Sequence, residues 1–211
     1  MAFYNESNDH TNFVASFTGN PKDDFGVFAK GYTLAADRLS NLLLGGPRSS
    51  DYEAYPIVFL YRHALELSLK HVIYTSAKLS AFKFLDDIEG ELRNTHDLTK
   101  LSQTVGALLS ILFPEDNGLR DIIALVKKTC SEFSDIDPRS DGYRYPIDSK
   151  GHPSTQQHQM INLRAFANRM SSVLEDLDTI HFGLDIETDK AQEVYEIIQD
   201  SLCSISSLDG L

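Results

Sequence analysis

Residues 59–70 read Phe59-Leu-Tyr-Arg-His-Ala-Leu-Glu-Leu-Ser-Leu-Lys70, which sets charged side chains into an otherwise apolar helical pattern. Arg62, Glu66 and Lys70 are spaced four residues apart, so they share one face of the expected helix. This face has two interpretations. Either the three side chains form a ladder of exposed i,i+4 pairs, or Glu66 is buried and pairs with Arg144 from a later loop. Both predict an ordered polar cluster in a helical domain.

Apolar residues recur at helical spacing on both sides of this segment. Pro56 fits only the opening turn of a helix, and Thr95 and Ser154 are candidate N-caps. The periodicity predicts helices over residues 24–44, 51–77, 96–113, 117–133, 154–181 and 190–204, with a short helix or ordered loop over 78–93. Because no strand pairs or βαβ alternation are present, we expect an all-α, antiparallel bundle of about five to six helices. Residues 1–20 should form an N-terminal arm and residues 21–211 a single helical domain.

Composition narrows the possible functions. The chain has 211 residues, with 31 acidic and 19 basic side chains and a net charge of -12, which disfavours non-specific binding to a phosphate backbone. Cys130 and Cys203 have no CxxC or Cys/His pattern around them, so we expect neither a metal site nor a disulfide, and no cofactor motif is present. The N-terminus does not resemble a signal peptide, and no apolar run is long enough for a bilayer. A cytoplasmic protein without membrane contact is expected.

Three short motifs occur in a characteristic order: Ala-Leu-Glu-Leu-x-Leu-Lys at residues 64–70, His-Asp-Leu-x-x-Leu at 96–101, and Tyr-Arg-Tyr-Pro at 143–146. Their order and spacing resemble the HEPN superfamily of prokaryotic helical domains. The resemblance implies a helical bundle that is often dimeric and that occurs in toxin–antitoxin pairs, phage-defence proteins and RNA-processing factors. Active members of the family are metal-independent ribonucleases. Their signature is an Arg, a polar residue and a His, with four to six positions between the Arg and the His.

The chain departs from this catalytic signature. Each Arg–His pair that comes near the signature has the wrong spacing. Two residues lie between Arg93 and His96, eight between Arg62 and His71, and seven between Arg144 and His152. The last pair is also interrupted by Pro146 and Gly151, so its members cannot share a regular helical face. We therefore expect a helical module without family ribonuclease activity.

Candidate site residues fall into two groups. The expected polar cluster comprises Arg62, Glu66, Lys70, His96 and Arg144, although His96 could instead serve only to start its helix. The candidates for catalysis are His63, Arg144 and His152, since a neutral histidine can act as a general base near pH 7. The polar loop over residues 134–153 is the longest break between helices, which makes it the favoured place for a site.

The sequence thus favours a non-catalytic HEPN-like module that acts as a homodimer or through a protein partner, in a phage-defence or toxin–antitoxin setting. The alternative is a divergent metal-independent ribonuclease or nucleotide-binding domain with a cleft around Arg62, His63 and Arg144. RNA or a nucleotide is the less favoured partner. Convergence of those side chains on an open basic pocket would favour the alternative, whereas burial of Arg144 against Glu66 would favour the module.

Overall fold

The computed structural model describes residues 24–46, 51–82, 95–137, 142–147, 150–154 and 160–208. Its helices are α1 (Asp24–Gly45), α2 (Ala54–Phe82), α3 (Leu98–Leu112), α4 (Asn117–Ile136) and α5 (Leu163–Leu208), and a short 3₁₀ turn (Asp51–Glu53) precedes α2. Within these described ranges, strand-like pairing is limited to one isolated bridge between Ile147 and Pro153. The all-α prediction is therefore confirmed. The expected N-terminal arm and the region 83–93 lie outside the described residues.

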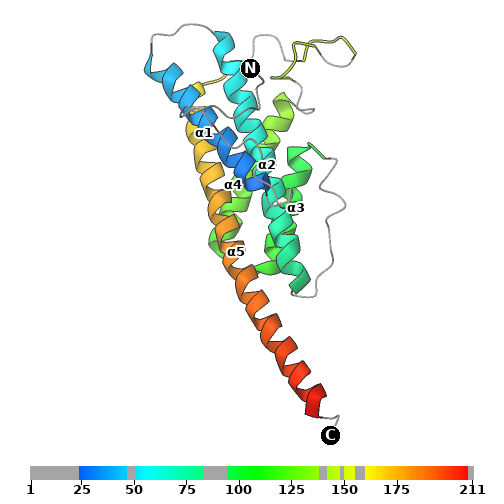
Figure 1. Ribbon diagram of the computed structural model, residues 1–211. Coiled ribbons are helices and arrows are strands. Elements are labelled where there is room, and N and C mark those ends of the chain that lie inside the picture. The colour runs from blue at the N-terminus through cyan, green and yellow to red at the C-terminus, as the bar shows by residue number, and fades with distance from the viewer. Residues whose placement is uncertain are drawn as a thin grey trace, which may run out of the picture.

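Helix α2 is the central element and packs against α1, α3 and α5 (Figure 1). Its apolar residues are buried on several sides, as the nearly continuous apolar pattern of the segment requires: Ile57, Val58, Tyr61, Leu65, Leu69, Val72 and Ile73 are all at most 2% exposed. Helices α3 and α4 form an antiparallel hairpin, and α4 makes a smaller contact with α5. Figure 1 also shows that α5 continues well beyond the end of the bundle.

The helix directions differ in part from the expected antiparallel arrangement. Helices α2, α3 and α5 run the same way, and α1 and α4 run opposite to them (Figure 1). Helix α4 therefore ends at the end of the bundle where α2 starts, and α3 and α5 both start at that same end (Figure 1). Consequently α3 and α5 start, and α4 ends, near Arg62 of α2. The ring of Phe166 at the start of α5 contacts both Tyr61 of α2 and Phe133 of α4 there.

Helices α3 and α4 begin at aspartate caps. Asp97 accepts hydrogen bonds from the backbone N–H groups of Thr99 and Lys100, at 2.9 and 3.1 Å, and Asp116 accepts one from Leu119. Thr95, the predicted cap, instead accepts a hydrogen bond from the Asp97 N–H. The prediction was wrong because a capping oxygen must stand directly before the first helical residue, and Leu98 is that residue.

The two helices predicted over residues 154–181 and 190–204 are one continuous helix, α5. It begins at Leu163 rather than after Ser154, and the Asn162 side chain accepts a hydrogen bond from the Ala165 N–H at its first turn. The stretch between the two predicted helices contains Gly183 but no proline. A glycine within a helix costs only about 1 kcal/mol, which is too little to end one whose other residues favour it.

Candidate functional site

The charged face of α2 is buried. Arg62, Glu66 and Lys70 are 4%, 3% and 5% exposed. The i,i+4 pairs that they form therefore lie inside the protein rather than on its surface. Glu66 Oε1 accepts a hydrogen bond from Lys70 Nζ at 2.9 Å, and Glu66 Oε2 accepts one from Arg62 Nη1 at 3.3 Å. Charges removed from water in this way are stable only when they are paired and hydrogen-bonded.

His96 completes the surroundings of Glu66. Its Nδ1 lies 2.7 Å from Glu66 Oε1, although its ring is largely exposed. Burial acts to raise the pKa of the Glu66 carboxyl, but the hydrogen bonds and charges of Lys70 and His96 outweigh it, so the pKa lies below its usual range. Glu66 is therefore an anion in the neutral pH range, and it holds the start of α3 against α2.

Arg62 of α2 contacts the residues just before α3 and just after α4. Its Nη2 donates a hydrogen bond to the His96 carbonyl oxygen at 3.2 Å, and its Nε forms an ion pair with Asp137 Oδ2 at 3.5 Å. Asp137 is 3% exposed, and its other carboxylate oxygen accepts a hydrogen bond from the Gly142 N–H at 3.0 Å. A Cβ at Gly142 would lie 2.9 Å from the Ser154 carbonyl oxygen, so the loop packs closely here. Asp137 thus fastens the long loop to the bundle.

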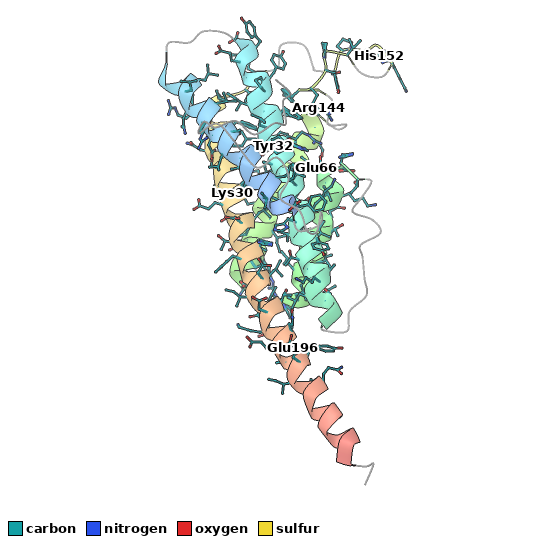
Figure 2. The ribbon with its side chains drawn as sticks, in the orientation of Figure 1. Lys30, Tyr32, Glu66, Arg144, His152 and Glu196 are labelled. Carbon is teal, nitrogen blue, oxygen red and sulfur yellow. The ribbon has the colours of Figure 1, made fainter. Side chains whose placement is uncertain are left out.

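The expected pairing of Glu66 with Arg144 is wrong. Arg144 is exposed, and its guanidinium lies over the rings of Phe59 and Tyr145, at 5.7 and 5.3 Å from their centroids. Arg62, Lys70 and His96 already surround Glu66, and Asp137 takes the loop-fastening role expected of Arg144. Figure 2 shows Glu66 within the bundle and Arg144 nearer its end.

Sequence reasoning missed Asp137. The predicted loop over residues 134–153 holds four aspartates that are equally plausible candidates, Asp135, Asp137, Asp141 and Asp148. Spacing alone cannot distinguish which of these carboxylates turns toward Arg62.

His63 belongs to a neighbouring aromatic group rather than to the buried charge cluster. Its ring stacks on Phe59, with centroids 5.7 Å apart and an interplanar angle of 8°, and meets Tyr32 edge-on at 4.5 Å. Burial is the main cause that lowers the His63 pKa, and the nearby charges of Arg144 and Arg62 lower it further against the opposing effect of Glu66. His63 is therefore a neutral imidazole at physiological pH. Phe59 contacts both His63 and Arg144, which brings these two candidates close together.

The other catalytic candidate, His152, is exposed and lies farther along the loop, beyond Arg144 in Figure 2. Arg62 is directed into the bundle by its three contacts. Arg62, His63 and Arg144, the side chains expected around an open basic pocket, therefore do not converge, because Arg62 is buried and directed into the bundle whereas His63 and Arg144 both contact Phe59.

A hollow of about 290 Å³ lies between α1, α2 and α5. Several of its polar groups are paired within the protein: Lys30 pairs with Asp178 at 3.3 Å, and Asp37 accepts hydrogen bonds from Tyr61 and Ser171 at 2.7 and 2.8 Å. His71 and His181 also line it, and their rings stack with centroids 3.6 Å apart. This arrangement stabilises the contact of α1 with the other two helices.

Within the described part of the chain, no group of three or more His, Cys, Asp or Glu residues is arranged to hold a metal ion. None of the helices described is long and apolar enough to cross a bilayer. Comparisons with protein-family models, with curated proteins and with solved structures give no match.

Proposed function

We propose that this chain is a non-catalytic helical module of the HEPN type that acts through contact with another macromolecule. The observation that carries the proposal is the internal pairing of its charged motif. Arg62, Glu66 and Lys70 are buried and bound to one another, and the further contacts of Arg62 and Glu66 go to the segments around the α3–α4 hairpin. Side chains used in this way stabilise a scaffold and cannot reach a substrate phosphate.

The arrangement of the three sequence motifs supports the HEPN assignment as a proposal. The first motif lies within α2, and the second starts α3, where His96 contacts Glu66 at 2.7 Å. The third lies in the loop after α4, where Arg144 of the motif contacts Phe59 of α2. Segments far apart in the chain thus form one structural unit, as expected of motifs that define a fold. A role in phage defence or in a toxin–antitoxin pair is part of this proposal.

Exposed apolar side chains support action by contact. On α1, Phe28 is 51% and Leu42 is 74% exposed, and α5 carries Val194 and Ile198 at 57% and 50%. Apolar side chains grouped on a helix surface are typical of surfaces that bind other proteins.

One observation favours a second candidate function, an RNA-cleaving or nucleotide-binding surface. The neutral His63 stacks on Phe59 and the cationic Arg144 lies over the same ring, a combination that can supply a base, a positive charge and a stacking ring. The buried Arg62 and the missing signature spacing weigh against it.

A cleavage assay separates the two functions. Wild type and the variants His63→Ala, Arg144→Ala and His152→Ala are incubated with labelled single-stranded RNA in the presence of a chelator. We expect no cleavage that depends on any of these residues. If wild type cuts the RNA and His63→Ala or Arg144→Ala does not, the non-catalytic module is the wrong assignment. Loss of cleavage in His152→Ala would overturn the assignment in the same way.

A further inference from the structure

Another hollow, of about 240 Å³, lies between the second half of α4 and the start of α5, where these two helices make a smaller contact. Its lining comes from α4, from the first two turns of α5 and from the two residues before α5. Most of that lining is apolar and includes Phe133, Ile136, Ile161, Phe166 and Met170. An engineered cavity of about 150 Å³ with an apolar lining takes up benzene, so this hollow has room for a two-ring molecule. We call it the α4–α5 hollow.

Two aromatic rings line the α4–α5 hollow. Phe133 and Phe166 meet edge to face, with centroids 5.7 Å apart and an interplanar angle of 73°. Aromatic rings prefer edge-to-face or offset partners with centroids about 4.5–7 Å apart. Met170 adds an adaptable thioether that also packs well on aromatic rings. This lining favours a flat aromatic molecule over a branched aliphatic one.

The charges around the hollow are balanced. Among the described residues that line it, one is acidic and one is basic, and these two, Glu132 and Arg169, form an ion pair with each other. A charged ligand would lose hydration here without finding an unpaired charge of opposite sign. The lining therefore favours a neutral molecule.

One buried polar group of the lining has no partner. Thr129 is 3% exposed, and within the described part of the chain its hydroxyl oxygen makes no hydrogen bond. Ser134 of the same helix donates to the Cys130 carbonyl oxygen, the usual bond of a helical hydroxyl, which Thr129 does not make. Threonine has two accessible rotamers in a helix, so its hydroxyl can turn toward a ligand. A ligand that accepts this hydrogen bond relieves an unfavourable buried group.

We propose that the α4–α5 hollow binds a small, neutral, two-ring aromatic molecule that carries one hydrogen-bond acceptor. The rings of Phe133 and Phe166 pack on the ligand, and the Thr129 hydroxyl donates to its acceptor and fixes its orientation. This site goes beyond the proposed function, because it gives the module a small-molecule ligand at a place that His63 and Arg144 do not line.

Quinoline and naphthalene serve as probes, because they share one shape and only quinoline has a ring nitrogen that accepts a hydrogen bond. Quinoline is uncharged near neutral pH. Full-length protein with carbon-13 in its methionine methyl groups reports binding by NMR: Met170 lines the hollow and is 0% exposed, whereas Met160 does not line it and is 94% exposed. We expect both probes to shift the Met170 signal, quinoline with a Kd of about 1 mM or below, and to leave the Met160 signal nearly unchanged.

Thr129→Val tests the hydrogen bond. Valine keeps the shape of threonine and removes a hydroxyl that has no partner within the described chain, so the variant should fold as stably as wild type. We expect it to weaken quinoline binding about three- to tenfold and to leave naphthalene binding within about twofold.

Two matched variants locate the site. Ala165 is exposed and lines the hollow, so Ala165→Phe should fill it and abolish binding of both probes. Ala107→Phe makes the same change at an exposed position of α3, outside the hollow, and should leave binding within about twofold. Circular dichroism confirms that each variant folds.

Three results would overturn the inference: no shift of the Met170 signal with either probe, an equal effect of Thr129→Val on both probes, or equal effects of Ala165→Phe and Ala107→Phe. The proposed function is tested separately by the RNA assay, because His63, Arg144 and His152 do not line the α4–α5 hollow.

Discussion

Glu66 should be a strong determinant of stability. Glu66→Ala removes the carboxylate that binds Lys70 at 2.9 Å and His96 at 2.7 Å, and it leaves a lysine that is 5% exposed without that partner. Removing one member of a buried ion pair costs about 3–5 kcal/mol. In a domain of 150–250 residues each kcal/mol lowers Tm by about 2–4 °C, so the expected loss is roughly 6–20 °C. Thermal unfolding followed by circular dichroism, with urea unfolding for the free energy, measures it.

The matched control is Glu115→Ala, because Glu115 is an exposed acid between α3 and α4 whose loss should cost under about 0.5 kcal/mol. The double variant Glu66→Met and Lys70→Met removes both charges of the Glu66–Lys70 pair and should be more stable than Glu66→Ala alone. Equal, small Tm changes in Glu66→Ala and Glu115→Ala would refute the reasoning.

Acid unfolding provides an independent check on Glu66. Because its folded pKa is depressed, its contribution to stability is complete above the unfolded value of about 4.3 and is lost as the pH falls through the lower folded value. The difference in unfolding free energy between wild type and Glu66→Gln should therefore be constant above about pH 5 and shrink as the solution is made more acidic. A difference that grows toward low pH would contradict the assigned shift.

Three other predictions concern a helix cap, a histidine and a thiol. Asp97→Ala removes the acceptor for two N–H groups of α3 and should cost about 0.5–2 kcal/mol in urea unfolding, whereas Asp97→Asn should cost less. The lowered pKa of His63 means that its stabilising contribution is full above about pH 6.5 and is lost as the pH falls. The stability of His63→Asn should thus vary less than that of wild type between pH 7.5 and 5. Burial raises the pKa of the Cys130 thiol to about 12, so peptide mapping after iodoacetamide treatment at pH 8 should show that Cys130 reacts on the order of 100-fold more slowly in the folded protein than in urea.

The helical architecture was predictable because it depends on local periodicity. Apolar residues at helical spacing indicated each of the five helices, and the buried state of Glu66 was one of two interpretations of its spacing. The cap of α3 was missed by two residues because Thr95 and Asp97 are both good caps, and only the backbone conformation selects between them. The continuity of α5 was missed because residues 182–190 hold Gly183 and four charged side chains, yet they contain nothing that ends a helix.

The candidate site was less predictable because its pairings are non-local. The sequence indicated that a loop residue binds the charged face of α2, but the choice of Asp137 over Arg144 depends on how the chain leaves α4. Arg62 could satisfy Glu66 from its own helix, so Glu66 needed no arginine from the loop. The assignment of the chain to the HEPN superfamily, and its role in phage defence or a toxin–antitoxin pair, are still predictions.

The contacts of Arg62 with His96 and Asp137 have a consequence for local unfolding. His96 lies just before α3 and Asp137 just after α4, so one side chain holds both ends of the hairpin to α2. Loss of these contacts frees both ends together, and α3 and α4 should then open as one cooperative unit while α1, α2 and α5 stay assembled. Native-state hydrogen exchange should accordingly show the amides of α3 and α4 sharing one opening free energy, which Arg62→Leu lowers for both helices at once.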